Sequence, residues 1–109
     1  MLSPNYYSQV EALSVSISPT SVSETDPVCP LSSSTITGTG SGGAGGYSYA
    51  WDWASGGTGI TINSPASQST TVTVAAAGIK IGTLRCTVTD ADTDTATDTI
   101  SVDMECGGV

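Results

Sequence analysis

The chain has 109 residues, of which 47 are Ser, Thr or Gly, and its net charge is −8. Its length allows one domain, and its two basic residues, Lys80 and Arg85, are too few to neutralise a row of phosphates or an anionic lipid surface. We therefore expect neither nucleic acid nor membrane as a partner. The absence of His removes the usual general base near neutral pH and the usual zinc ligand.

Residues 1–12 lie outside any alternating pattern and are predicted to form an N-terminal arm. They contain neither a basic nor an apolar region typical of a secretory signal, so we expect a native start at Met1. The arm carries apolar and aromatic side chains that are costly to expose and common at interfaces. These predicted partner-binding residues are Leu2, Tyr6, Tyr7 and Val10. The alternative is a disordered terminus.

Seven later segments alternate apolar with polar residues, as strands do when one face is buried. In chain order they are residues 13–18, 35–40, 47–53, 60–62, 71–74, 84–89 and 99–104. Clusters of Gly, Ser, Pro, Asn and Asp separate them, which is typical of turns. The pattern predicts an all-β fold, an immunoglobulin-like antiparallel β-sandwich of about seven strands over residues 13–106 with a tail at 107–109.

One parity of these segments supplies the predicted core. Its members are Leu13, Val15, Ile17, Ile36, Tyr49, Trp51, Ile60, Ile62, Val72, Val74, Leu84, Cys86, Val88, Ile100, Val102 and Met104. Tyr47, Tyr49, Trp51 and Trp53 share one face of their strand. We expect that face to point into the core, because Ser48, Ala50 and Asp52 fill the other one. An exposed row would instead offer a stacking platform for sugar rings.

Two loops carry candidate chemistry. The glycine-rich stretch 42–46 lacks the Lys-Ser/Thr of a phosphate-binding loop and precedes a strand, so a flexible connection is expected. Asp90, Asp92 and Asp94 have the alternate spacing with which loop oxygens surround Ca²⁺. The run lacks the glycine and distal glutamate of a calcium-binding loop, and a solvated hairpin is the alternative. We predict no cofactor, and no catalytic nucleophile or base is recognisable.

The three cysteines, Cys29, Cys86 and Cys106, are odd in number, so at least one is free or pairs between chains. None has the Cys-x-x-Cys spacing of a zinc site, and no metal centre is expected from them.

The stretch from residue 47 to 102 resembles the immunoglobulin-like modules, akin to the polycystic-kidney-disease-type domain, of bacteriophage structural proteins and bacterial surface proteins. The resemblance rests on Gly46-Tyr47-Ser48-Tyr49-Ala50-Trp51, Ile60-Thr61-Ile62-Asn63-Ser64-Pro65, Ser69-Thr70-Thr71-Val72-Thr73-Val74, Leu84-Arg85-Cys86-Thr87-Val88-Thr89-Asp90 and Thr95-Ala96-Thr97-Asp98-Thr99-Ile100. Residues 13–45 resemble the family loosely.

The resemblance implies that Trp51 is the core tryptophan of the third strand and that Cys86 lies in the middle of the sixth. The position that would hold the partner of Cys86 falls near Gly38, so the usual inter-sheet disulfide cannot form, and Leu84 stands where a corner tyrosine is expected. Cys86 is therefore expected to be a buried, inert thiol. In this topology Cys29 and Cys106 lie at the same end. A Cys29–Cys106 bridge and three separate thiols both remain open.

Because the resembled family is not catalytic, we expect a non-enzymatic virion protein, an immunoglobulin-like decoration protein on the exterior of the capsid, anchored by its arm to other virion proteins. A homo-oligomer is compatible with this expectation. The alternatives are a tail or neck component, and an adhesion-type module of a bacterial surface protein that binds glycans.

Overall fold

The computed structural model describes residues 11–107, which form ten β-strands and no helix. The strands are β1 Ser14–Ser18, β2 Ser21–Asp26, β3 Leu31–Ser32, β4 Ile36–Ser41, β5 Ser48–Gly56, β6 Ile60–Ile62, β7 Ser69–Thr70, β8 Val72–Val74, β9 Gly78–Thr89 and β10 Thr95–Cys106. Within this part of the chain there is thus no helix of the length and apolarity that crossing a membrane requires.

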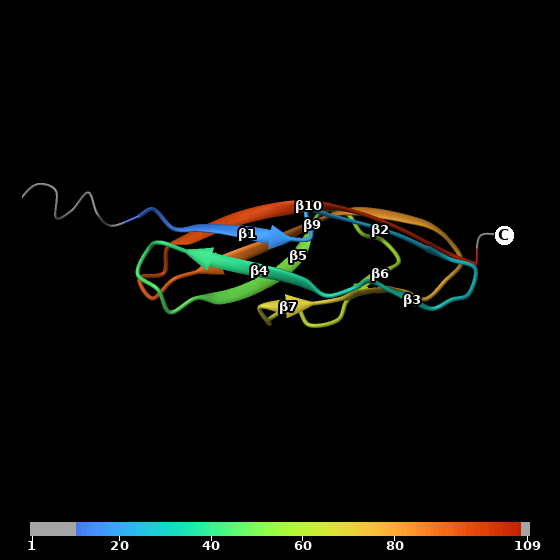
Figure 1. Ribbon diagram of the computed structural model, residues 1–109, viewed down its shortest axis with the longest axis horizontal. Coiled ribbons are helices and arrows are strands. Elements are labelled where there is room, and N and C mark those ends of the chain that lie inside the picture. The colour runs from blue at the N-terminus through green and yellow to red at the C-terminus, as the bar shows by residue number, and fades with distance from the viewer. Residues whose placement is uncertain (1–10, 108–109) are drawn as a thin grey trace, which may run out of the picture.

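The strands form two layers (Figure 1). One layer is a four-stranded sheet in the order β2-β10-β9-β5. The other layer consists of two three-stranded sheets, β1-β4-β7 and β3-β8-β6. Short connections lead from β3 into β4 and from β7 into β8, so the two small sheets follow each other along the molecule. The predicted all-β sandwich is confirmed.

Three strands were missed by the sequence analysis, namely β2, β3 and β7. β2 also departs from the predicted antiparallel arrangement, because it pairs in parallel with β10, from Ser21↔Ser101 to Asp26↔Cys106. The chain changes layers between β1 and β2: β1 pairs with β4 in one layer, and β2 joins β10 in the other. The alternating pattern of residues 13–18 predicted β1 but carried no information about this crossing.

The core lies between the two layers. Ile36, Val72, Val74, Leu84 and Met104 are fully buried, and most of the predicted inward residues surround them. Four predicted members are only half-buried: Leu13, Val15, Tyr49 and Ile62. The core also takes in two residues beyond the predicted strands, Val22 on β2 and Cys106 at the end of β10.

The body is elongated, and the described chain enters at one end and leaves at the other (Figure 1). β1 and β2 run one after the other along the long axis, toward the end where the chain leaves. The two long strands β9 and β10, with 12 residues each, form a hairpin that runs back along the same axis. Strand length therefore sets the long dimension of the molecule.

Candidate functional site

The predicted partner-binding residues Leu2, Tyr6, Tyr7 and Val10 lie outside the described residues, and their role stays a prediction. The described chain begins beyond them at Glu11, whose carbonyl accepts a hydrogen bond from the Gly43 amide at 2.8 Å. The glycine-rich loop is thus tied to the strand entrance, and it is also bonded to the β9–β10 turn, where Ala91 N–H donates to the Gly45 carbonyl at 2.8 Å. The flexible loop expected from the sequence is instead held at both of its ends.

The three aspartates proposed as calcium ligands are not arranged as a metal site. Asp90 is buried, and its carboxylate accepts hydrogen bonds from the backbone amides of Ala44, Asp92 and Asp94 at 2.9–3.0 Å. These hydrogen bonds hold the pKa of Asp90 below its ordinary value, and the bond from Ala44 has the largest effect. Burial acts in the opposite direction. Asp92 and Asp94 are exposed. Within residues 11–107 no group of three His, Cys, Asp or Glu side chains could hold a metal ion.

The aromatic row packs toward the core. Trp51 is buried and donates its indole N–H to the Ser67 carbonyl at 2.7 Å, while Tyr49 and Trp53 pack against the core cluster. Tyr47 is half-buried and donates its hydroxyl to the Gly42 carbonyl at 2.7 Å. With the indole and phenol groups engaged in this way, the row offers no flat exposed platform for sugar stacking.

A disulfide joins Cys29 and Cys106, the pair that the sequence analysis left open, with 5.2 Å between the Cα atoms. Cys29 follows β2, and Cys106 is the last residue of β10. Cys86 is a free, buried thiol. Burial, with a smaller contribution from the charge of Asp98, raises the pKa of Cys86 to about 11, so the thiol stays protonated and unreactive at neutral pH.

Gly38 faces Cys86 across the core. A Cβ atom added at Gly38 would lie 2.8 Å from the Cys86 sulfur, closer than two such atoms approach without a bond. The absence of a side chain at Gly38 therefore leaves the room that the Cys86 thiol occupies. Leu84 and Val88, the neighbours of Cys86 on the inward face of β9, are also fully buried.

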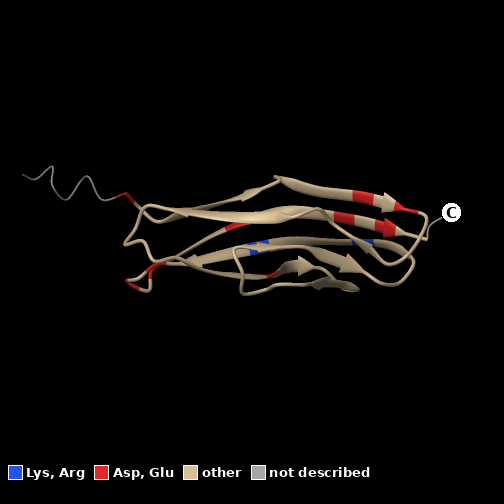
Figure 2. Cartoon of the chain, turned by 60° about the horizontal axis from the view of Figure 1, so that its bottom comes forward, with Lys and Arg blue, Asp and Glu red and all other residues tan. Residues whose placement is uncertain are grey.

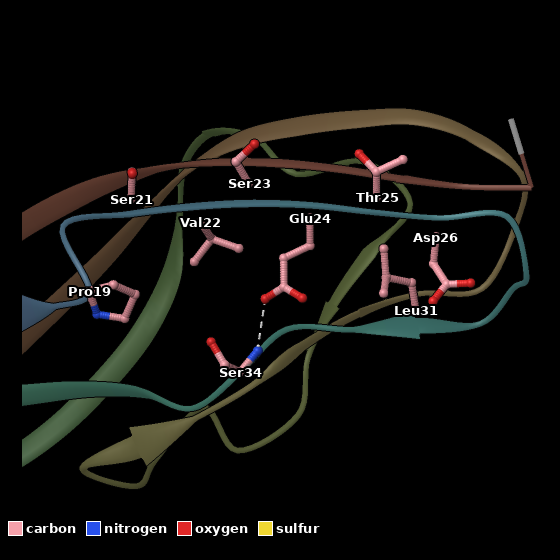
Figure 3. A pocket seen from close by; sticks show the side chains of 9 residues that line it. All are labelled: Pro19, Ser21, Val22, Ser23, Glu24, Thr25, Asp26, Leu31 and Ser34. Atoms are coloured by element: carbon pink, nitrogen blue, oxygen red, sulfur yellow. Dashed lines mark hydrogen bonds between the residues drawn. The ribbon is translucent and has the colours of Figure 1, made fainter.

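A groove lies where the two layers meet along β2 and β3 (Figure 3). Its volume is about 540 Å³, and it is lined by Pro19, Ser21, Val22, Ser23, Glu24, Thr25, Asp26, Leu31 and Ser34. Its floor combines the apolar side chains of Pro19, Val22 and Leu31 with the carboxylates of Glu24 and Asp26. β2 ends the order of its sheet, so its side away from β10 pairs with no strand of the described residues.

Two hydrogen bonds fix the acidic side chains of this groove. The Glu24 carboxylate accepts from the Ser34 amide at 2.9 Å and links β2 to the segment after β3 (Figure 3). The Asp26 carboxylate accepts from the Val28 amide at 2.8 Å, and its backbone carbonyl accepts from Gly107 at 3.0 Å. Cys29, three residues after β2, is bonded to Cys106, the last residue of β10, so the ends of these two paired strands are held together.

Two carboxylates, those of Glu24 and Asp26, line the groove. Asp103 and Glu105 of β10 pair with Ser23 and Thr25 of β2, so these two acidic side chains lie on the opposite face of the sheet. Figure 2 shows acidic residues concentrated near the ends of two neighbouring strands close to the C-terminus. Ser21–Asp26 holds a single aliphatic residue, so this strand and its groove were not predicted from the sequence. The available signal was the alternation of Ser21, Ser23 and Thr25 with Val22, Glu24 and Asp26.

Residues 24–104 match the family described as K319L-like, PKD domain. No curated protein matches the chain. The solved PKD domain of the KIAA 1837 protein aligns with a TM-score of 0.53 and 24% identity, over 82% of this chain and 84% of that one.

A second solved structure is a nucleoside hydrolase-related hypothetical protein from Saccharophagus degradans that is associated with carbohydrate metabolism. It aligns with a TM-score of 0.60 and 16% identity, over 95% of this chain. This chain spans only 28% of the length of that protein, so the likeness concerns the fold of one part.

The fold and the matched segment define a PKD-type β-sandwich module. Because the match covers more than half of the chain, this chain belongs to the K319L-like PKD domain family.

Proposed function

We propose that this PKD-type module is a non-enzymatic structural protein that projects from the exterior of a bacteriophage virion. In this proposal it decorates the capsid, and residues 1–12 anchor it to other virion proteins. The observation that carries the proposal is the position of the two ends of the described chain, at opposite ends of an elongated body (Figure 1). An anchor at one end of such a body leaves the other end free in solution.

The surface charge supports an exterior position. The chain has ten acidic residues and only two basic ones. One of the two, Arg85, is paired with Asp52 on the neighbouring strand, with 2.9 Å between its Nε and the carboxylate. The hydrogen bond from Arg85 holds the pKa of Asp52 below its ordinary value, so both side chains are charged at neutral pH. An acidic surface of this kind keeps a protein soluble and repels polyanions such as packaged DNA.

The proposal of a non-enzymatic role draws on how the polar side chains are used. Asp90 binds three backbone amides, and the buried Ser33 hydroxyl donates to the Ser34 carbonyl and accepts from the Val72 amide. These groups satisfy backbone atoms of a turn and of a strand end, which is a structural use.

Immunogold electron microscopy tests the location. Antibodies raised against the recombinant chain are applied to particles and to cells from a culture that carries the gene. We expect label on the outer face of the capsid. Label on the tail or neck would make the protein a component of that part instead, and label confined to the bacterial envelope would overturn the virion proposal.

Deleting residues 1–12 tests the anchor. We expect the shortened chain to fold, because β1 begins at Ser14, with a slightly lower melting temperature from the lost Glu11–Gly43 hydrogen bond, and to lose incorporation into particles. The control replaces residues 1–12 by a Gly/Ser segment of equal length, which preserves chain length and should also fail to incorporate. Normal incorporation of either variant would contradict the proposed role of the arm.

A second candidate is an adhesion-type module of a bacterial surface protein that binds glycans. The observation in its favour is the fold shared with part of a protein associated with carbohydrate metabolism. The aromatic row gives it no support, because that row packs into the core. Sedimentation of the chain with insoluble polysaccharides separates the two candidates: the virion proposal predicts that the protein stays in the supernatant.

A further inference from the structure

We infer that the groove along β2 is a docking site for an extended segment of a partner protein, whose alternate side chains, two of them basic and one apolar, face the groove. The segment would add to the free edge of β2 as a further strand of the four-stranded sheet. This inference concerns the sandwich itself and is independent of whether the module stands on a virion.

The free edge supplies the backbone part of the recognition. β2 has six residues in a row paired with β10 on one side only. Exposed edges of this kind attract other strands, and most proteins protect them by a covering loop, a proline or an inward-pointing charge. Among the described residues no strand covers β2, and its protection comes from Glu24 and Asp26, which line the groove.

The side chains of the groove define the chemistry of the segment. An added strand would place alternate side chains into the groove, since successive residues of a strand point to opposite faces. Near Val22, Leu31 and Pro19 the groove accepts an apolar side chain, and near Glu24 and Asp26 it accepts Lys or Arg. In the described part of the chain, each of these two carboxylates uses one oxygen in a hydrogen bond and keeps the other without a partner.

Charge complementarity decides between occupants. A second copy pairing through its own β2 would oppose acidic side chains to acidic side chains, which destabilises a strand pair. Residues 1–10 of this chain contain no Lys or Arg that could pair with these carboxylates. The two carboxylates that line the groove, Glu24 and Asp26, favour instead a partner of opposite charge.

The groove is also preorganised. The Cys29–Cys106 disulfide and the Gly107 to Asp26 hydrogen bond fix one end of β2, and the Ser34 to Glu24 bond fixes its distance from the opposite wall (Figure 3). A rigid groove loses little conformational entropy on binding, which favours a short ligand.

Peptide titration followed by NMR of the ¹⁵N-labelled full chain tests the inference. The probe is acetyl-Thr-Lys-Thr-Lys-Thr-Val-Thr-amide, and its matched control carries Glu in place of both Lys. We expect amide shifts concentrated in residues 21–26 and 31–34, and binding at least tenfold tighter for the Lys peptide in low salt. Equal affinities, or shifts elsewhere on the chain, would overturn the inference.

Backbone methylation distinguishes strand addition from simple charge attraction. Two versions of the Lys peptide are N-methylated at alternate residues. In one version the methylated amides are those that would face β2, and in the other they are those that would face solvent. Strand addition predicts that one of the two loses binding and that the other keeps it, because only alternate amides face the neighbouring strand. Equal behaviour of the two methylated peptides would contradict strand addition.

Two double variants complete the test. Glu24→Gln with Asp26→Asn keeps the acceptor oxygens for Ser34 and Val28 but removes both charges, and should weaken the Lys peptide at least tenfold. Asp92→Asn with Asp94→Asn also removes two negative charges, but in the β9–β10 turn at the other end of the molecule, and should change the affinity for the Lys peptide less than twofold. Melting temperatures verify that both variants fold. Light scattering that reveals a dimer closed through β2 would assign the groove to a second copy and refute the inference.

Discussion

At the residue scale, the contact between Gly38 and Cys86 explains how this sandwich does without a disulfide between its layers. The Cys86 thiol fills the space on one side, and the absence of a side chain at Gly38 makes room for it on the other. Tyr49 and Trp51 border the same position, at 3.4 and 3.5 Å from an added Cβ. The close packing of the two layers at this point therefore depends on both Gly38 and Cys86.

Gly38→Cys should create a disulfide with Cys86, because the added Cβ lies within bonding geometry of the existing sulfur. Closing a loop of about 50 residues is worth up to about 4 kcal/mol in the unfolded-chain entropy account. Alkylation of the denatured protein should find no free thiol in the variant and one in the parent chain. The control Gly38→Ser adds bulk without a bond and should lower the melting temperature. A persistent free thiol in the cysteine variant would contradict the predicted geometry.

Asp90 is the second residue whose role depends on its surroundings. Its charged form accepts three backbone hydrogen bonds, which lowers its pKa from the ordinary value of about 3.9. A lowered pKa means that this stabilisation is fully present above the unfolded-state value and is lost as the pH falls through the folded-state value.

Asp90→Asn should therefore lower the melting temperature most between pH 5 and 7, since an amide cannot accept all three bonds. The difference from the parent chain should shrink as the pH falls from about 4 to 2, because the parent carboxylate becomes protonated there. Thermal unfolding followed by circular dichroism measures both. The exposed Asp92→Asn is the control and should show little effect, and a difference that stays constant with pH would exclude the role of the charge.

At the element scale, β5, β9 and the turn after β5 pack through glycines. Gly56 pairs with Gly82, and the register of β5 shifts between Trp53 and Ser55. The Trp53 ring lies over Gly57 and Gly82: a Cβ added at Gly82 would come within 2.9 Å of the ring and 2.6 Å of the Gly57 nitrogen. The glycines thus let a large aromatic ring lie flat against the backbone of two elements.

Gly82→Ala should destabilise the fold by about 1–3 kcal/mol, the usual cost of inserting a methyl group into a packed site. Because the nearest atom belongs to the backbone, the neighbour cannot simply rotate away. Urea unfolding measures the change, with Ser48→Ala at an exposed position of β5 as the control. A neutral result would show that the turn at Gly57 shifts freely.

At the scale of the whole molecule, the Cys29–Cys106 disulfide joins the end of the last strand, β10, to the segment that follows β2. Between Glu11 and Cys29 the chain follows β1 and β2, which already run in series along the long axis (Figure 1). A pulling force applied at the two ends therefore passes through an extended stretch and then through the disulfide. The remaining strands lie inside the covalent loop.

The oxidised module should be almost inextensible. Residues 11–29 would span about 60 Å as strands and about 65 Å when fully extended, so unfolding under force should release only on the order of 5–20 Å. After reduction the whole described chain is released, and the gain should be on the order of 280 Å. Single-molecule force spectroscopy of several copies of the chain joined in tandem measures both lengths, with Cys29→Ser as a reduced-state control. A long gain in the oxidised protein would contradict this force path.

The alternating pattern alone determined the two-layer architecture, most of the core and the inward position of Cys86. Side chains alternate between the faces of a strand, so a local run of residues is enough to assign each side chain to the core or to solvent. The position of Gly38 opposite Cys86 followed from the same parity together with the family resemblance.

Other features depended on contacts between residues far apart in the chain. The parallel pairing of β2 with β10 joins segments about 80 residues apart, and the weak pattern of Ser21–Asp26 gives no local sign of it. Asp90 looked like a solvated loop residue or a calcium ligand, but the amide of Ala44, 46 residues away, makes it a buried anchor. The tertiary structure decided these points, because pairing partners, buried carboxylates and the closure of the groove follow from which distant segments meet.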